Sequence, residues 1–571
     1  MKKFILSVLA VALTSAALAA PQNAKNDKVI NIMNKELTRS FKKLSKATPP
    51  VYFLSYTITD ANNYYAAAVL GGISYEYSNS KRFLDVEART GSRKMDNTRK
   101  IKSFDLDDMS RGGGSGGYSV PLGNDDKTLQ TLLWLRTEDT VKAAQEDYLK
   151  VKTNSATASE RSDSSDDFSA PISAHSFYEA KEMPVFDKEA VKQQLKEYST
   201  LFAGYDFILT SSVEFSVQNI NTYFVNTENA KIRKGQNLLR ISYSISSRNK
   251  DGMQLQRGNS YDSFTFEGLA KPEVIKADIA KSIEELKALQ NAPVAEPFHG
   301  PAILKNRATG VFFHEILGHR IEGHRQKDDD FGQTFTAKVN QQIISPLISV
   351  YDNPTLSNFN GTDLRGHYMV DDEGVMSQNL TLIENGVLKN FLMSRSPVNN
   401  FPQSNGHGRK EPGRIAVSRM GNTIVKANKT VTFEELRNLL IEEIKKQDKP
   451  YGLIIDDISG GFTMTDTSSP QAFKVLPLLV YKVYPDGRPD QIIRGADIVG
   501  TPLVSFNKIT AAANDDAVFN GSCGAESGWV PVSAIAPSVL VSEIEVEKVE
   551  KSYENLPLLP APPAQTKQEV K

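Results

Sequence analysis

Residues 312–325 read FFHEILGHRIEGHR. The apolar side chains of this stretch recur at helical spacing, which predicts a helix with one face buried in a core. They are Phe312, Phe313, Ile316, Leu317 and Ile321. Asn306 is placed to cap the start of this helix. Burial of the apolar face would leave His314, Glu315 and His319 facing a cleft, where they can bind a metal or move a proton.

The interval between the two histidines differs from the familiar helical motif, in which the metal-binding histidines are four residues apart. His314 and His319 are separated by five positions, which on a regular helix turns their imidazoles about 140° apart. Both can reach one ion only where the helix widens or breaks. Gly318 is the position where we expect that break. Glu315 and His319, four apart, share one face.

A catalytic zinc site uses three protein ligands and leaves a fourth position open for water. Two candidates for the third ligand follow from the sequence. Cys523, the only cysteine of the chain, lies in a glycine-containing stretch that we interpret as a loop between apolar runs. His324 is the alternative. A lone cysteine can equally be a small buried hydrophobe, so the residue types alone leave this choice open.

The sequence before residue 291 predicts sheets combined with helices. Residues 83–89 alternate apolar and charged side chains, the pattern of a strand with one solvated face. We expect an N-terminal α+β domain over residues 20–120 and a middle domain with a long helix over residues 121–290. Residues 157–169 are rich in Ser and Asp, which favours an exposed, mobile connection.

Residues 291–550 predict a β-rich C-terminal domain that carries the histidine helix. Asn385 and Gly386 separate two strand-like runs and favour a type I′ hairpin turn. Thr432 and Glu435 form a capping box that opens a helix. The proline-rich residues 551–571 predict a disordered tail. The fold class is therefore α+β and multi-domain.

The N-terminus predicts export. Two lysines, an apolar run and a small-residue cleavage site indicate a signal peptide over residues 1–19, cut after Ala19. No later stretch is long and apolar enough to span a membrane, so we expect no membrane span after cleavage. Lys+Arg 67 against Asp+Glu 68 gives a net charge of −1, which argues against a nucleic-acid partner. The expected location is periplasmic or extracellular.

Several of these motifs together resemble the TldD/PmbA family of metallopeptidases, sometimes labelled modulators of DNA gyrase. The resemblance covers about residues 293–546. Its motifs are His314-Glu-x-x-Gly-His319 with Glu322-Gly323, residues 371–374 (DDEG), the hairpin of residues 383–388, and Ser522-Cys523-Gly524 ahead of Val530-Pro531-Val532. This chain departs from the family in having His324 where an acidic residue is usual, and in its signal peptide.

The resemblance implies a metal bound by His314, His319 and Cys523, with Glu315 as the acid/base residue. Zinc suits mixed nitrogen and sulfur ligands, although residue types leave iron and manganese open. Glu322 could orient His319 from outside the ligand set, and His324 could also lie there. Family members assemble as dimers, which implies a homodimer or a heterodimer with a related chain.

We therefore expect a metallopeptidase that hydrolyses peptide bonds in unfolded or extended peptides, with Glu315 as general base toward a metal-activated water. The alternative is a non-catalytic peptide-binding or assembly subunit with a structural metal. That alternative requires a fourth protein ligand such as His324 to close the coordination shell.

Overall fold

The computed structural model describes residues 27–99, 117–155, 163–172, 175–327, 332–465, 473–500 and 507–549. The predicted signal peptide of residues 1–19 and the predicted tail of residues 551–571 lie outside these residues. The described chain is a strand-rich mixture of helices and sheets, which confirms the predicted α+β class. No helix of the described part is both long and apolar enough to cross a membrane.

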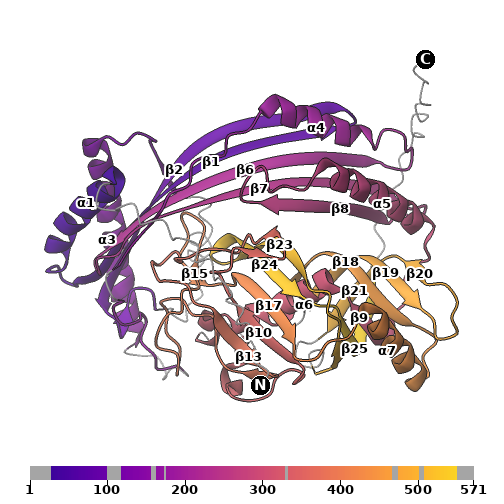
Figure 1. The fold of residues 1–571 in the computed structure, drawn as a ribbon. Helices are drawn as coiled ribbons and strands as arrows, with labels where there is room; N and C mark the ends of the chain where they lie inside the picture. The colour runs from indigo at the N-terminus through magenta and orange to yellow at the C-terminus, as the bar shows by residue number, and fades with distance from the viewer. Residues whose placement is uncertain are drawn as a thin grey trace, which may run out of the picture.

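One long sheet spans the first half of the chain. Its four long strands arch over the C-terminal half (Figure 1). They are β1 (Val51–Val69), β2 (Gly72–Ser92), β6 (Thr210–Asn226) and β7 (Lys231–Arg248). The strand order is β3-β2-β1-β6-β7-β5, with β4 paired to β2 and β8 to β7. The shorter strands are β3 (Met95–Asp96), β4 (Tyr118–Val120), β5 (Ser176–Glu179) and β8 (Gln254–Ser263). Because β1 pairs with β6, the division predicted at residue 120 runs through this single sheet.

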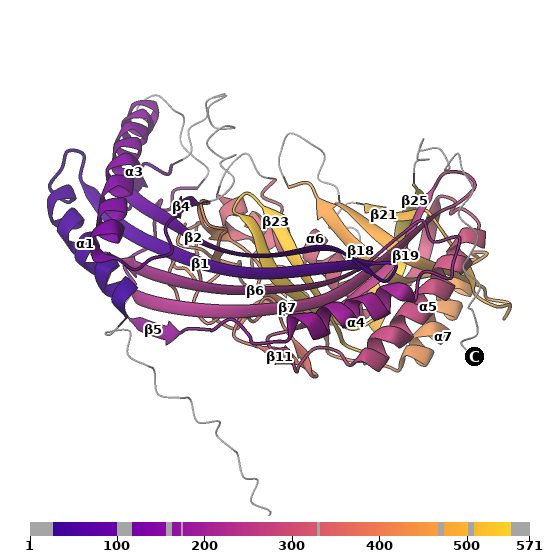
Figure 2. The same cartoon turned by 90° about the horizontal axis from the view of Figure 1, so that it is seen from above.

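Helices lie toward both ends of this sheet (Figure 2), and they share cores with side chains of one of its faces. Helices α1 (Lys28–Leu44) and α3 (Asp126–Ser155) share a core with Tyr56 and Ile58 of β1. Helices α4 (Lys188–Thr200) and α5 (Pro272–Asn291) share another core, to which β1 contributes Tyr64. Successive side chains of a strand point to opposite faces, so the odd-numbered residues of β1 face away from the helices.

The described part of the Ser/Asp-rich segment corrects the prediction of an exposed connection. Phe168 is 1% exposed, and Asp167 and Ser169 are also buried. The reason is a cation–π sandwich: the guanidinium carbons of Arg89 and Arg395 lie 3.9 and 4.0 Å from the centroid of the Phe168 ring. One aromatic side chain thus anchors a stretch whose composition is otherwise that of a solvated loop.

The C-terminal half contains two larger sheets that pack around the histidine helix α6 (Asn306–Ile316). The first sheet has the order β14-β13-β10-β17-β24-β23, and the second β18-β9-β25-β21-β19-β20, with β22 paired to β25. The strands of the first are β10 (Ile348–Asp352), β13 (Leu380–Glu384), β14 (Val387–Leu388), β17 (Asn422–Ala427), β23 (Ala517–Ala525) and β24 (Gly528–Ala536). Those of the second are β9 (Phe298–Leu304), β18 (Gly452–Thr463), β19 (Phe473–Val483), β20 (Gln491–Ile493), β21 (Ala496–Gly500), β22 (Ile509–Ala512) and β25 (Val539–Lys548).

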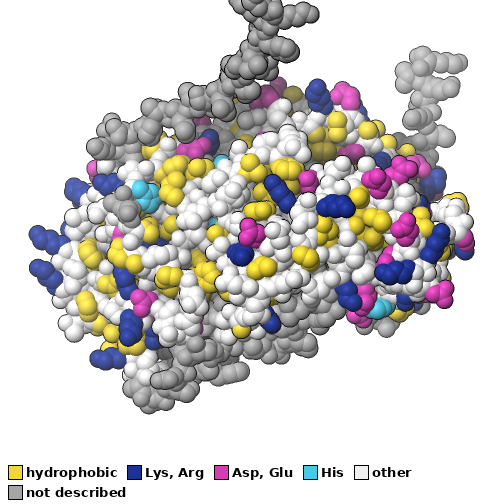
Figure 3. Space-filling view, turned by 60° about the horizontal axis from the view of Figure 1, so that its bottom comes forward, with side chains coloured by type: hydrophobic (Ala, Val, Ile, Leu, Met, Phe, Trp, Pro, Cys, Tyr) yellow, Lys and Arg dark blue, Asp and Glu magenta, His cyan; other side chains and the backbone are white. Residues whose placement is uncertain are grey.

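Two local predictions in this half are confirmed. Asn385 and Gly386 both have positive φ, at 46° and 84°, and connect β13 to β14 as a tight hairpin. Helix α7 (Phe433–Lys446) begins at the capping box formed by Thr432 and Glu435. Two short pairs, β11 (Asn358–Phe359) with β12 (Thr362–Asp363) and β15 (Gly408–Arg409) with β16 (Val417–Ser418), complete the strands. On the face in Figure 3, acidic and basic side chains are interspersed among apolar ones.

Candidate metal centre

Helix α6 ends just before the second histidine. The α-helical hydrogen bonding stops at Ile316, and a 3₁₀ turn, η2, runs over Gly318–Ile321. This confirms the break predicted at Gly318. An added Cβ there would overlap the buried thioether of Met420, so the Met420 side chain would have to move to admit one.

The start of α6 differs from the prediction. The N-cap residue is Lys305, which makes no side-chain capping bond, and Asn306 is the first helical residue. Ser538, in the connection between β24 and β25, takes over part of the capping role. Its hydroxyl accepts a hydrogen bond from the Asn306 backbone N–H at 3.1 Å. The Asn306 side chain donates to the Asp515 carbonyl, and its Oδ1 accepts from the Arg307 backbone N–H at 2.8 Å.

The change of helix type brings both imidazoles to one thiol. The Nε2 atoms of His314 and His319 lie 3.2 and 3.3 Å from the Sγ atom of Cys523. The two rings stand almost perpendicular, with centroids 5.1 Å apart. All three side chains are buried, at 8%, 7% and 5% exposure. Two segments about two hundred residues apart in sequence therefore meet at one point.

Cys523 lies in a strand, which corrects the loop interpretation of its surroundings. It belongs to β23, where it pairs with Val530 of β24. The glycines that suggested a flexible loop, Gly521 and Gly524, lie in the same strand. Strand β23 is the edge strand of its sheet, so its other side pairs with no further strand among the described residues.

The three donor atoms lie within 4.8 Å of one another, and in the described part of the chain they form the one group of His, Cys or acidic side chains arranged to hold an ion. The surrounding charges favour the thiolate, which is the form of Cys523 that can bind a metal. Although burial opposes the charged form, the two imidazoles hold the pKa of Cys523 well below its ordinary value. Burial likewise opposes charge on His319, but Cys523 and Glu322 raise its pKa. Two nitrogen donors and a thiolate match the ligands that Zn²⁺ takes.

Glu322 holds His319 in place. Its carboxylate lies 3.3 Å from Nδ1 of His319 and accepts from Nε of Arg325 at 2.8 Å. The side chain is fully buried, and burial alone would raise its pKa. The neighbouring His319 and Arg325 outweigh that effect and lower the pKa of Glu322 to about 2. A carboxylate on the far ring nitrogen fixes the tautomer that presents Nε2 to an ion.

Arg419 belongs to no motif of the sequence analysis and was not predicted as a site residue. It is fully buried, and one of its guanidinium nitrogens donates to the Cys523 carbonyl at 2.6 Å. Its Nε lies 3.6 Å from the Glu322 carboxylate, and another nitrogen donates to Ser527. Arg419 therefore connects the segment that carries the thiol to the carboxylate that orients His319. A single arginine outside any motif has no sequence signal that could have identified it.

Glu315 lies beside the donor set without belonging to it. It is 7% exposed, and its side chain packs on the backbone of Gly461 in β18, where an added Cβ would come within 2.7 Å of the Glu315 Cγ. Burial raises the pKa of this carboxyl above its ordinary value, against the lowering influence of the two histidines. A carboxylate with a raised pKa is suited to accept and return a proton.

His324 does not join the donor set. Its Nε2 lies 2.5 Å from the Glu526 carboxylate, which also accepts from Arg325 at 2.9 Å. Glu526 is in the turn between β23 and β24, so this contact fastens the segment after η2 to the hairpin that carries Cys523. The fourth ligand that a closed structural site requires is thus not supplied by His324.

The fold and the site together define a mixed α+β protein with a candidate metal centre of two histidines and one cysteine. Residues 298–548 match the PmbA/TldA metallopeptidase C-terminal domain. This stretch is therefore a domain of the PmbA/TldD family, which confirms the resemblance seen in the sequence.

Curated relatives carry related names. The chain is 28% identical over 284 residues to a metalloprotease TldD homolog of Haemophilus influenzae, covering 48% of this chain and 55% of that protein. It is 24% identical over 357 residues to a metalloprotease of Methanothermobacter thermautotrophicus, covering 62% of this chain and 73% of that protein. A zinc metalloprotease TldD homolog of Saccharolobus solfataricus is 27% identical over 249 residues, covering 43% and 51%. The match thus spans about half the length of the first and third relatives.

Solved structures show the same fold over nearly the whole chain. A Thermotoga maritima protein named as a candidate modulator of DNA gyrase matches with a TM-score of 0.59 at 16% identity, covering 90% of this chain and 100% of that one. The TldE protein of Thermococcus kodakarensis matches with a TM-score of 0.56 at 14% identity, covering 91% and 100%. At these identities the likeness establishes the fold alone.

Proposed function

We propose that this chain is a metal-dependent peptidase in which His314, His319 and Cys523 hold the ion and Glu315 is the general base. The observation that carries the proposal is the convergence of three buried donor atoms within 4.8 Å, beside a carboxylate that is not one of the donors. Three protein ligands with an open position are typical of catalytic rather than structural zinc sites. The names of the relatives indicate the same activity.

When bound, the metal would supply Lewis acidity that activates water and polarises a scissile carbonyl. The residues of the chain do the remaining work. Glu315 accepts the proton of the attacking water and returns it to the leaving amine. Glu322 keeps the His319 ring oriented, and Arg419 holds the strand of Cys523 against it. Burial of all these groups excludes bulk water and strengthens their mutual interactions.

Zinc is the metal we favour. Mixed imidazole and thiolate ligands suit it, and one curated relative is named a zinc metalloprotease. Iron and manganese are alternatives that metal analysis of the purified protein distinguishes directly.

We further propose unfolded or extended peptides as substrates. The edge strand β23 carries Cys523 and leaves backbone groups on one side without a strand partner among the described residues, so an extended peptide can align beside the centre by strand addition. A homodimer, or a heterodimer with a TldE-like chain, is the proposed assembly, because the chain has the fold of a TldE protein. The proposed location is periplasmic or extracellular.

The decisive variant is Glu315→Gln, which removes the base and preserves the shape of the side chain. We expect peptide hydrolysis to fall by about 10²- to 10⁴-fold while the zinc content per chain stays unchanged. Digestion of an unfolded protein substrate, followed by mass spectrometry, gives the rates, and elemental analysis gives the metal. Glu384→Gln, an exposed glutamate in β13, is the matched control. A wild-type protein that retains zinc and cleaves no peptide would favour the non-catalytic subunit.

A further inference from the structure

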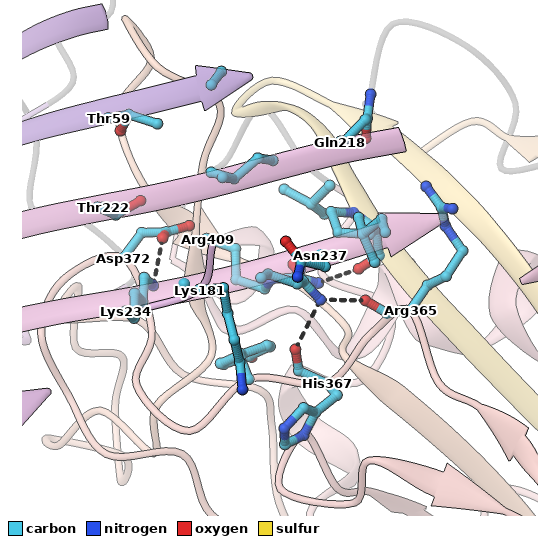
Figure 4. Close-up of a pocket in the computed structure, with 18 of the residues that line it drawn as sticks. Thr59, Lys181, Gln218, Thr222, Lys234, Asn237, Arg365, His367, Asp372 and Arg409 are labelled. Carbon is cyan, nitrogen blue, oxygen red and sulfur yellow. Dashed lines mark hydrogen bonds and ion pairs between the residues drawn. The ribbon is translucent and has the colours of Figure 1, made fainter. Parts of the chain in front are cut away.

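A large cavity lies between the concave face of the long sheet and the C-terminal half. Its volume is about 810 Å³, within the range of ligand-binding sites. Figure 4 shows Thr59, Gln218 and Thr222 on neighbouring strands of the sheet. Across the cavity lies the C-terminal half, where Arg365 is in a turn and Arg409 is in β15. None of the residues proposed for the metal centre lines this cavity.

The cavity and the metal centre lie on opposite faces of the β23–β24 hairpin. Ser522, Trp529 and Pro531 line the cavity, whereas Cys523 lies between Ser522 and Gly524 and is buried with its side chain toward α6. Alternate residues of a strand face opposite sides, which explains the separation. The cavity and the metal centre are therefore separated by one hairpin, whose outer strand β23 is an edge strand of its sheet.

Several of the charged side chains that line the cavity are already engaged within the protein. Lys234 binds Asp372 at 2.7 Å, and Lys410 binds Asp85 at 3.2 Å. Arg409 donates to two backbone carbonyls. Because these side chains already have partners, the cavity favours an uncharged polar ligand over a phosphate or another anionic ligand.

Hydrogen-bonding capacity is nevertheless available on the sheet wall. The side chains of Thr59, Gln218 and Thr222 make no hydrogen bond to another described residue. The lining residues of β1 are every second one, Thr57, Thr59, Ala61 and Asn63. Such a row repeats at about 7 Å, the same period as the like-facing groups of an extended peptide.

We propose that this cavity binds an extended, unfolded segment of polypeptide outside the metal centre and so retains the substrate chain near the site of cleavage. The proposal rests on the proposed peptidase function. The ligand is recognised through its backbone amides by the threonine and amide side chains of the sheet wall, and Phe83, Phe177 and Trp529 accommodate apolar side chains.

The test measures peptide binding without cleavage. In the Glu315→Gln background, a fluorescein-labelled, unstructured peptide of about 20 residues, long enough to cross the sheet face, is titrated by fluorescence anisotropy. Filling the cavity with Gln218→Trp and Thr222→Trp together should weaken binding by at least about tenfold, equivalent to 1.4 kcal/mol. Gln218→Trp alone should weaken it less, and because Gln218 is exposed in the cavity this single variant guards against misfolding.

Thr210→Trp is the control, because Thr210 is an exposed residue of the same strand outside the cavity. This variant should keep the peptide affinity within about twofold of the original, well below the tenfold loss, equivalent to 1.4 kcal/mol, that is expected of the double cavity variant. Thermal unfolding and zinc content establish that each variant is folded. Unchanged peptide affinity in folded cavity variants would overturn the proposal. It would also be overturned if the protein bound a chitin hexasaccharide more tightly than the peptide and the same variants abolished that binding. The wild-type protein could also cleave no peptide and yet bind peptide with an affinity that Gln218→Trp weakens. That result would support the proposed role of the cavity and reject the proposed peptidase function.

Discussion

Arg419 links the two sequence segments of the metal centre through a buried hydrogen bond to one segment and a buried ion pair with the other. It donates to the Cys523 carbonyl and approaches Glu322, which in turn contacts His319. These contacts join residues about one hundred positions apart in the sequence, so the network is specified by tertiary geometry rather than by local sequence. Arg419 is therefore a positioning residue for the donor set.

Removing this guanidinium should affect both folding and metal binding. We expect Arg419→Met to lower the free energy of unfolding by about 3 kcal/mol, because Glu322 and the Cys523 carbonyl lose a buried partner. Zinc affinity, measured by chelator competition at a temperature where the variant is folded, should fall at least about tenfold. Arg437→Met, at a partly exposed ion pair with Asp490, should change the stability by less than about 1 kcal/mol. If folded Arg419→Met kept the wild-type zinc affinity, Arg419 would not be a positioning residue for the donor set.

Side-chain patterns in the sequence identified the donors, because His314 and His319 stand in a motif and Cys523 is the single thiol. The choice of Cys523 over His324 depended on the family resemblance rather than on residue types. Arg419 and Glu526 were not predictable, because each acts through tertiary contacts with residues about one hundred to two hundred positions away. Whether the three donors hold an ion stays a prediction.

At the scale of elements, the end of α6 sets the geometry of the site. A spacing of five residues would separate the imidazoles on a continuous helix, and the switch to a 3₁₀ turn at Gly318 brings them together. The sequence predicted this break from one glycine and one interval. It did not predict the strand of Cys523, because the glycines of β23 are typical of loops and only pairing with β24 makes the segment extended.

Gly318→Ala tests the role of the break. The added methyl group overlaps buried Met420, so we expect a loss of about 1–3 kcal/mol in the free energy of unfolding, measured in urea. Gly123→Ala is the control, since an added Cβ there meets nothing within 4 Å. Equal stability of the two variants would show that the core tolerates a side chain at residue 318.

The turn of residues 371–374 gives the fold a pH dependence of its own. Burial and the nearby Asp371 raise the pKa of Glu373 to about 8. Its ordinary value is about 4.3, so the folded protein keeps a proton that the unfolded chain releases between these values. The stabilising contribution of Glu373 is therefore complete below about pH 4.3 and is lost as the pH rises through 8.

Glu373→Gln keeps the neutral form at every pH. We expect the free energy of unfolding of this variant, measured across about pH 5 to 8, to fall less steeply with pH than that of the wild type. Parallel pH profiles for the two proteins would mean that Glu373 is ionised in the fold.

At the scale of the whole molecule, the long sheet and the C-terminal half enclose a cavity beside the metal centre. Alternating patterns in the sequence predicted strands in both halves, but could not show that strands on either side of residue 120 pair in one sheet, because that pairing is between distant segments. The composition of residues 157–169 was misleading about the described residues 163–169 for a similar reason: the contacts of Phe168 come from elsewhere in the chain.

Export is a property of the whole molecule that can be tested independently. If the predicted signal peptide is removed after Ala19, intact mass spectrometry of the protein from the extracytoplasmic fraction should give a chain that begins at Ala20. A full-length chain confined to the cytoplasm would contradict the proposed location while leaving the metal centre unaffected.

Zinc K-edge X-ray absorption of the purified protein, compared with that of Cys523→Ser, tests the proposed metal ligands most directly. If His314, His319 and Cys523 hold the ion, the wild type should show one sulfur ligand at about 2.3 Å and nitrogen ligands at about 2.0 Å, and the sulfur signal should be absent from the variant. A wild-type spectrum without a sulfur ligand, or a protein that binds no metal, would contradict this set of ligands.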